Sequence, residues 1–335
     1  MYTNLTHNAN EVFLNINKEN RPDNPLVSCV APCYNEASNI EALANEIHQI
    51  FQNLNLRYEL ILVNDGSTDN TALIAKNLLK NFPIKFIQLS RNYGKEIALS
   101  AGIDHAKGDF CILIDADLQH PPQLINDFYE HWLEGYDMVY GFRVSREDES
   151  LAKRCFVSFF YNLINLGQKI KITPNTLDYR LMDRKVMEAM KALPESNRFM
   201  KGLYNWVGFT NIGLPVELSS RVAGQTSFNF INLFKLAMTG LTAFSNVPLR
   251  LWGILGAIIS LTSFAYGFWV LLETLIWGNP TPGWPTVIVF QSFLSGILLM
   301  SIGIIGEYIG RIFTEVKRRP LYFVSQIMES DDQSN

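Results

Sequence analysis

Two common glycine-rich nucleotide-binding motifs are missing from this sequence. No G-x-G-x-x-G follows the first predicted strand, which disfavours a dinucleotide-binding domain, and no G-x-x-x-x-G-K-[ST] occurs, which excludes a P-loop. An excess of basic residues is also lacking, because the formal net charge is −4 at pH 7. Nucleic acid is therefore not an expected partner.

Cysteine is scarce, and residues 1–24 contain no apolar run. The four cysteines have no C-x-x-C spacing, and Cys29 and Cys111 lie in apolar segments that predict strands. We therefore expect buried free thiols in a reducing compartment. Residues 1–24 have neither the basic start nor the apolar core of a signal peptide, and we expect a polar, loosely packed extension there.

From residue 26 onward the sequence alternates between short apolar segments and amphipathic ones. Predicted strands cover residues 26–32, 58–63, 84–89, 109–114 and 138–142. Predicted helices cover residues 38–54, a segment ending near 81, 94–106 and 123–133. Ser38 and Glu41 have the spacing of a capping box at the start of the first helix. This order predicts an α/β fold with a mostly parallel sheet wrapped by helices.

Polar residues follow each predicted strand. In chain order they are Pro32, Tyr34, Asn35 and Glu36; Asp65; Ser90, Arg91 and Asn92; Asp115 and Asp117; and Arg143. Turns are polar in any case, so one such turn would carry little weight. Ligands of parallel sheets bind at the carboxyl ends of the strands, and five polar turns on one rim predict a nucleotide-sized cleft.

The turn after the fourth predicted strand contains two carboxylates, Asp115 and Asp117. Side chains at positions i and i+2 of an extended chain lie on the same face, so both can reach one site. Two hard oxygen ligands suit a divalent cation that also holds a diphosphate. The alternative is a solvated turn, because Asp-x-Asp after a strand is common.

Two uncharged segments near the C-terminus predict membrane spans. Residues 251–272 and 285–306 are each about 33 Å long as helices, enough for a hydrocarbon core of about 30 Å. The connecting loop has no Lys or Arg, whereas basic residues flank the other ends. The positive-inside rule then predicts a multi-pass plasma (inner) membrane protein with its globular domain and both termini in the cytoplasm. A buried helical hairpin is the alternative.

Two further segments are amphipathic at helical spacing. Residues 151–170 combine apolar residues with flanking Lys153, Arg154, Lys169 and Lys171, which is typical of a helix in a membrane interface. A helix packed on the protein core is the alternative there. Residues 228–246 form a similar candidate beside the membrane.

These segments divide the chain into an extension (1–24), a catalytic domain (25–227), a juxtamembrane helix (228–246), a two-helix hairpin (247–313) and a cytoplasmic tail (314–335). Small residues in the second span would allow close helix packing, either within a monomer or in a homo-oligomer. They are Ser295, Gly296, Ser301, Gly303, Gly306 and Gly310.

Seven motifs in this order resemble family 2 inverting glycosyltransferases, and most closely the polyprenyl-phosphate branch that includes dolichol-phosphate mannose synthase and bactoprenol glucosyltransferases. They are APCYNE (31–36), VNDGSTD (63–69), LSRNYGKE (89–96), DADLQHPP (115–122), DYRLMD (178–183), RVAGQTS (221–227) and FSNVPLR (244–250). The resemblance implies a nucleotide-sugar transferase (GT-A, Rossmann-like) domain. Processive polysaccharide synthases also carry a Gln-x-x-Arg-Trp segment, which is absent here.

The resemblance also implies residue roles. Base and ribose contacts would come from Pro32, Tyr34, Glu36 and Asp65, and the diphosphate–metal motif from Asp115, Ala116 and Asp117. Asp117 and Gln119 would ligate Mg²⁺ or Mn²⁺. Arg143 and Arg221 would bind phosphate of the donor or the acceptor.

Some roles remain open at this stage. The family often has a Lys where Ser227 stands, and Lys95 is a candidate substitute for that cation, or else caps a helix or pairs with Glu96. Asp178 and Arg180 would orient the acceptor phosphate or form an internal salt bridge. His120 is expected as a turn residue rather than a base.

The expected reaction is inverting transfer of a hexose, glucose from UDP-glucose, to a polyprenyl phosphate at the cytoplasmic face of the bilayer. GDP-mannose and UDP-4-amino-arabinose are alternative donors. A non-catalytic membrane scaffold subunit is the alternative from another class, and the intact Asp115 and Asp117 pair argues against it.

Overall fold

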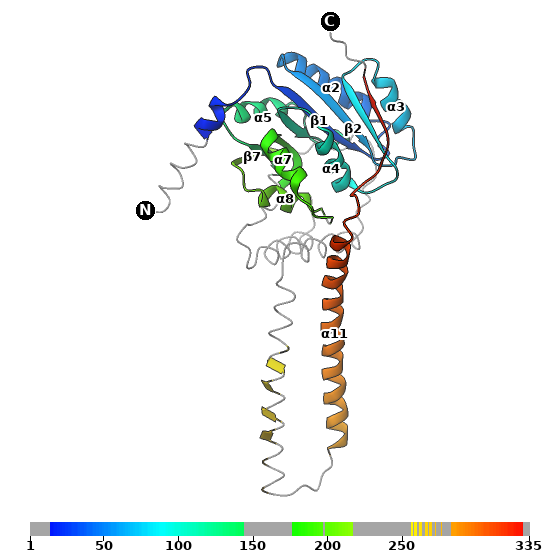
Figure 1. Ribbon diagram of the computed structural model, residues 1–335, viewed down its shortest axis with the longest axis vertical. Coiled ribbons are helices and arrows are strands. Elements are labelled where there is room, and N and C mark those ends of the chain that lie inside the picture. The colour runs from blue at the N-terminus through cyan, green and yellow to red at the C-terminus, as the bar shows by residue number, and fades with distance from the viewer. Residues whose placement is uncertain are drawn as a thin grey trace.

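The computed structural model describes residues 14–143, 176–196, 198–216 and 283–330, together with positions 256, 258–259, 261–262, 265–266, 268–269, 272 and 276. These residues form an α/β domain from which one long helix extends away (Figure 1). The predicted interfacial helix (151–170) and juxtamembrane helix (228–246) lie outside the described residues.

A single sheet organises the domain, with strand order β7-β5-β6-β4-β1-β2-β3-β8. The strands are β1 (Leu26–Cys33), β2 (Arg57–Asn64), β3 (Ile84–Leu89), β4 (Phe110–Leu113), β5 (Met138–Arg143), β6 (Thr176–Asp183), β7 (Asn211–Val216) and β8 (Val324–Glu329). Strands β3, β2, β1 and β4 pair in parallel, as do β5 and β7. The mostly parallel α/β fold is confirmed, and the five predicted strands correspond to β1–β5. Three strands were not predicted: β6 and β8, which pair antiparallel with their neighbours, and β7, which pairs in parallel with β5.

Helices cover both faces of the sheet (Figure 1). They are α2 (Ile40–Asn53), α3 (Thr71–Leu78), α4 (Lys95–His105), α5 (Leu124–Leu133), α7 (Arg184–Ala192) and α8 (Met200–Trp206). Side chains of β1 alternate between the two faces: Cys29 and Ala31 pack with α2 and α5, and Val30 packs with α4. Burial on both faces explains why these strands read as continuous apolar runs. The predicted buried free thiols are confirmed for Cys29 and Cys111.

The predicted capping box does not form at the start of α2. The N-cap residue is Asn39, and its side chain makes no capping hydrogen bond. Instead the Asn39 amide donates to Glu36 Oε2 at 2.6 Å. The Glu36 side chain, and hydrogen bonds from the backbone N–H groups of residues 35–37 to side chains that follow β2, hold the polar turn after β1.

Part of the N-terminal extension packs firmly against the domain. The Arg21 side chain is 8% exposed and lies over the Trp132 ring at 4.3 Å from its centroid. Its guanidinium donates to the Trp132 and Tyr136 carbonyl oxygens and pairs with Asp183. The prediction of a loosely packed extension is wrong for this part, because a buried cation with several acceptors cannot be mobile without losing them.

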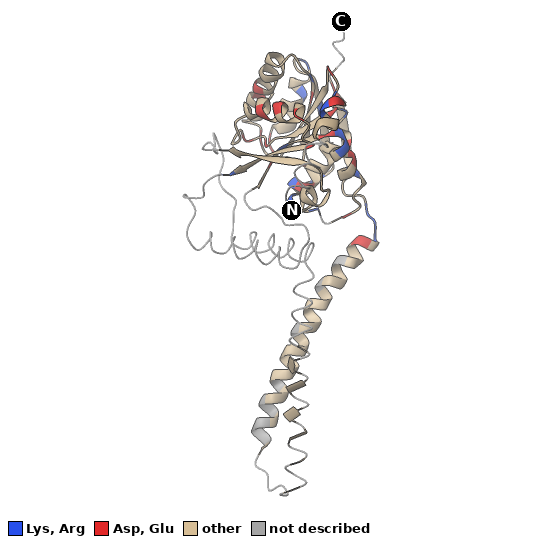
Figure 2. Cartoon of the chain, turned by 90° about the vertical axis from the view of Figure 1, so that its left-hand side faces the viewer, with Lys and Arg blue, Asp and Glu red and all other residues tan. Residues whose placement is uncertain are grey.

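Helix α11 (Trp284–Val316) extends away from the domain (Figures 1 and 2). Within it, residues Phe293–Val316 form a helix long and apolar enough to cross a membrane, the one such helix in the described part of the chain. Most of its described apolar side chains are exposed, with Leu299 at 69% and Val316 at 70%. The first predicted span (251–272) falls largely outside the described residues and stays a prediction.

After α11 the chain returns to the domain as β8, which pairs antiparallel with β3. Lys85 pairs with Glu329 at 3.2 Å. The C-terminal segment thus ties the long helix to the edge of the sheet.

Candidate active site

The turn after β4 has the geometry of a binding loop. Asp115 and Asp117 are partly exposed, and Ala116 between them is buried. Leu118 has a φ of 56°, in the left-handed region that a leucine adopts only at a cost of about 1–3 kcal/mol. This backbone reversal lets the Gln119 N–H donate to Asp117 Oδ1 at 3.2 Å. The loop therefore holds the Asp117 carboxylate against the backbone of Gln119, the other predicted metal ligand.

Asp65, at the end of β2, links two loops of the site. Its carboxylate is 3% exposed and accepts hydrogen bonds from the backbone N–H groups of Tyr93 (2.7 Å) and Gly94 (2.8 Å). Burial raises the pKa of Asp65, although these two hydrogen bonds act in the opposite direction. Its structural role is to fix the loop that leads into α4 and places Lys95.

Lys95, the first residue of α4, bridges two carboxylates. Its Nζ lies 2.6 Å from Asp115 Oδ1 and 3.1 Å from Asp178 Oδ2. Burial alone would raise the pKa of Asp115, but Lys95 and His120 outweigh it and lower that pKa. His120 Nε2 lies 3.3 Å from the other oxygen of Asp115. The carboxylate partners of Lys95 are thus Asp115 and Asp178, not the Glu96 that the sequence suggested, and its proposed role as a phosphate-contacting cation stays a prediction.

Strand register explains why Asp178 is there. Strands β4 and β6 are antiparallel with Leu113 opposite Arg180, and two further residues bring Asp178 opposite Asp115. Arg180 itself is 2% exposed, and its guanidinium lies over the Tyr204 ring at 3.4 Å. It donates to the Leu177 carbonyl oxygen at 2.6 Å. Its predicted role at the acceptor phosphate is not tested by these contacts.

The predicted base and ribose contacts lie at the end of β1. Tyr34 is 48% exposed, and Asn35 has a φ of 57°. The Asn35 side chain accepts a hydrogen bond from the Thr68 N–H at 2.9 Å, which joins this turn to the one after β2. Pro32 pairs with Val63 in the parallel register of β1 and β2. The base and ribose contacts predicted from sequence thus lie together at the carboxyl ends of β1 and β2.

Two predicted phosphate-binding residues differ in placement. Arg143 ends β5 and is partly exposed. Arg221 lies outside the described residues, as does Ser227. Their roles remain predictions.

Comparison with known proteins identifies the family. Residues 28–190 match the description "Glycosyl transferase family 2". An uncharacterized glycosyltransferase of Synechocystis sp. is 48% identical over 305 residues, covering 90% of this chain and 95% of that protein. The chain belongs to glycosyl transferase family 2. The prophage-derived bactoprenol glucosyl transferase of Shigella flexneri is 41% identical to this glycosyltransferase over 301 residues, covering 90% of this chain and 97% of the relative.

A solved structure of glucosyl-3-phosphoglycerate synthase from Mycobacterium tuberculosis, in complex with Mn²⁺, UDP-Glc and phosphoglyceric acid, is also similar. It shares 20% sequence identity with a TM-score of 0.42, covering 68% of this chain and 80% of that chain. The family resemblance inferred from the seven motifs is confirmed by the relatives of higher identity.

The donor set of this glycosyltransferase fits a divalent cation that is completed by a ligand. Among the described residues, no group of three or more His, Cys, Asp and Glu side chains is placed to hold a metal ion. Mg²⁺ is usually bound by one or two carboxylates plus phosphates of the substrate, so a protein cage is not required. Asp117 and Gln119 supply oxygen atoms of the right kind on one loop.

Glu96 was not predicted as a member of this site. It is half-buried, and its carboxyl accepts the Met200 N–H at 3.0 Å. Burial, together with the negative charge of Asp178, raises the pKa of Glu96 to about 7, against opposing effects of Lys95 and Lys201. Asp115 and Asp178 lie against the same Lys95, so this cation offsets the burial of Glu96 only in part. The sequence signal that could have identified Glu96 as a site residue was its position next to Lys95 at the start of α4.

This raised pKa predicts a pH-dependent stability. The folded state binds the Glu96 proton more tightly than the unfolded state does. The contribution of Glu96 to the free energy of unfolding is therefore fully present below its unfolded-state pKa and is lost as the pH rises through the folded-state pKa of about 7. The loss should be at most about 3 kcal/mol. In Glu96→Gln the midpoint of thermal unfolding should change less between about pH 5 and pH 8, whereas Glu188→Gln, on the exposed face of α7, should behave as the wild type. A Glu96→Gln profile identical to the wild type would contradict this assignment.

Proposed function

We propose that this enzyme transfers glucose, with inversion, from UDP-glucose to a polyprenyl phosphate at the cytoplasmic face of a membrane. The structural observation that carries the proposal is the turn after β4, where partly exposed Asp117 lies beside Asp115, which is neutralised by Lys95. The choice of sugar and acceptor is supported by relatives named bactoprenol glucosyl transferase at 40–41% identity.

The departing nucleoside diphosphate needs positive charge. Mg²⁺ or Mn²⁺ held by Asp117 and Gln119 would neutralise the diphosphate as the glycosidic bond breaks, which is the largest contribution that such a site can make. Asp115 is paired with Lys95. Asp117 is the proposed carboxylate ligand of the cation. Arg143 and Arg221 are the proposed additional phosphate contacts, and Pro32, Tyr34, Glu36 and Asp65 those for the base and ribose.

The proposed acceptor needs little help from a base. A phosphate monoester has a second pKa near 6 and is mostly dianionic at pH 7, so it can attack the anomeric carbon directly. His120 is poorly placed as a base, because it is 5% exposed and its Nε2 lies against Asp115. Orientation of the acceptor by Asp178, Arg180 and Arg221 is part of the proposal.

The membrane arrangement is also proposed. Helix α11 and the segment over residues 251–272 would form a two-span hairpin, with the domain and both termini in the cytoplasm. Described positions between 256 and 276 are helical, and Tyr266 contacts Phe290 of α11 with ring centroids 6.3 Å apart. Interfacial helices over residues 151–170 and 228–246, and a homo-oligomer packed through small residues of α11, complete the arrangement.

The decisive test is transfer by the purified full-length protein. With radiolabelled UDP-glucose, Mg²⁺ and undecaprenyl phosphate, the label should move to the lipid fraction, and chelation with EDTA should stop the reaction. GDP-mannose and UDP-4-amino-arabinose should be poor donors under the same conditions. Efficient transfer from either of these, with none from UDP-glucose, would overturn the choice of sugar. Metal-independent binding of UDP with no transfer would favour a non-catalytic subunit.

A further inference from the structure

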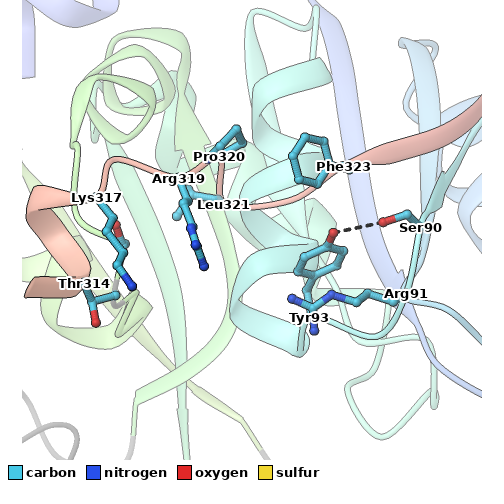
Figure 3. Close-up of a pocket in the computed structure, with 10 residues that line it drawn as sticks. Ser90, Arg91, Tyr93, Thr314, Lys317, Arg319, Pro320, Leu321 and Phe323 are labelled. Atoms are coloured by element: carbon cyan, nitrogen blue, oxygen red, sulfur yellow. Dashed lines mark hydrogen bonds between the residues drawn. The ribbon is translucent and has the colours of Figure 1, made fainter. Parts of the chain in front are cut away.

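A cavity of about 660 Å³ lies where the end of the long helix meets the loop after β3. Figure 3 shows lining residues from the loop after β3, with Arg91, and from the end of α11 and the segment that follows it, with Lys317, Arg319 and Phe323. Ser196, in the segment after α7, also lines the cavity. The established family membership assigns nothing to this cavity.

The end of α11 explains how two cations reach one cavity. The helix ends at Val316, and Arg318 has a φ of 46°, which reverses the chain at that point. Lys317 and Arg319, on either side of this reversal, line the cavity, whereas Arg318 does not. Lys317 Nζ lies 3.9 Å from the centroid of the Phe313 ring, so it is held beside the last turn of the helix.

The opposite wall is equally well defined. The Ser90 N–H donates to the Phe323 carbonyl oxygen at 2.9 Å, which ties the two loops together. Arg91 stacks on Tyr93 with its guanidinium carbon 4.3 Å from the ring centroid. The cavity is therefore built by packed loops rather than by a free tail.

The charge balance of the cavity favours an anion. Within the described part of the chain, Arg91, Lys317 and Arg319 form no salt bridge with an acidic side chain. A nearby carboxylate, that of Glu315, is directed to the Ser196 N–H, which its two oxygen atoms accept at 3.0 Å. Three cations around one cavity without a carboxylate among them match a phosphate group.

The lining is also partly apolar. Phe323 is 59% exposed, and Pro320 and Leu321 lie beside it. A free phosphate ion would gain nothing from this surface, whereas the glycerol and upper acyl chains of a lipid would cover it. The cavity also lies at the end of α11, the helix proposed to span the bilayer, and that placement would bring it to the cytoplasmic headgroups. Basic pockets at this depth suit anionic lipid headgroups.

We propose that this cavity binds the phosphate headgroup of an anionic phospholipid from the cytoplasmic leaflet, separately from the acceptor lipid. The inference rests on the membrane placement of α11 given under the proposed function. A lipid held there would fix the angle between α11 and the sheet edge formed by β3 and β8, and so hold the domain at a set height above the bilayer.

Two adjacent arginines provide the test. Arg319 lines the cavity and Arg318 does not, and both lie just beyond the same helix end, so Arg319→Gln and Arg318→Gln lose the same charge at nearly the same depth. Full-length protein in neutral detergent is titrated with dihexanoyl phosphatidylglycerol, and binding is followed by microscale thermophoresis. Arg319→Gln should weaken this binding about fivefold, and Arg318→Gln should leave it unchanged. Lys317→Gln is a second cavity variant in case Arg319→Gln does not fold.

Several results would overturn the proposal. Equal weakening by Arg318→Gln and Arg319→Gln would mean a diffuse basic surface without a site. Inorganic phosphate binding as tightly as phosphatidylglycerol would mean a site for a free anion. Equal binding of dihexanoyl phosphatidylcholine would remove the requirement for an anionic lipid. Since no donor or acceptor is present, failure here leaves glucosyl transfer intact, and a protein that binds the lipid without transferring glucose would contradict only the proposed function.

Discussion

Asp117→Asn should lower the rate of glucosyl transfer by about a thousandfold, which corresponds to about 4 kcal/mol of transition-state stabilisation. The asparagine keeps the size of the side chain and its acceptor oxygen, so the hydrogen bond from the Gln119 N–H to this side chain can persist. What is lost is the negative charge that would hold Mg²⁺ against the diphosphate. The measurement is initial rate with saturating UDP-glucose over a range of Mg²⁺ concentrations, where the variant should also require more metal.

Asp127→Asn is the matched control. Asp127 lies exposed on α5, and its substitution removes the same charge from the protein surface. It should keep wild-type activity. Full activity of Asp117→Asn would show that the cation, if one is used, is held elsewhere. Loss of activity together with a lowered unfolding midpoint would instead show that Asp117 supports the fold of the turn.

Arg180→Ala should destabilise the protein by about 3–5 kcal/mol. The side chain is 2% exposed, stacks on Tyr204 and donates to the Leu177 carbonyl oxygen. Its removal leaves a cavity and takes a cation away from Asp178, whose pKa is lowered in part by Arg180. Chemical denaturation of the full-length protein in detergent, with and without the substitution, measures this difference.

Arg184→Ala provides the control for Arg180→Ala. Arg184 is the first residue of α7, its side chain is 45% exposed, and it lies 3.9 Å from Asp109, so its loss should change stability by less than about 1 kcal/mol. The predicted role of Arg180 at the acceptor gives a different outcome. If Arg180→Ala folds with wild-type stability but raises the KM for undecaprenyl phosphate, Arg180 contacts the acceptor rather than supporting the core.

Much of the nucleotide-binding part of the site could be predicted from local sequence patterns. The predicted strand over residues 84–89 coincides with β3, and the other four predicted strands differ from β1, β2, β4 and β5 by one or two residues at their ends. Each is a short apolar run ended by a polar turn, and such a signal is contained in the segment itself. Asp65 and Asp115 therefore fall where the pattern placed them, at the carboxyl ends of β2 and β4.

Contacts between segments far apart in the sequence could not be predicted from local patterns. The bridge from Lys95 to Asp178 depends on β6 lying antiparallel to β4. Likewise, the packing of Arg21 on Trp132 joins a polar N-terminal segment to α5, and a polar composition alone suggests a loose end. Strand β8 was missed for the same reason, because its partner β3 lies more than two hundred residues earlier in the chain.

The sequence by itself determined the α/β class, the glycosyltransferase family and the carboxylates of the turn after β4, because hydrophobic periodicity and motif order are local properties of the chain. Only the tertiary structure decided which charges neutralise one another around Asp115 and which basic residues meet beneath the domain. Those outcomes depend on strand register and on where a helix ends in space, and one residue of slippage in β6 would turn Asp178 to the opposite face of the sheet.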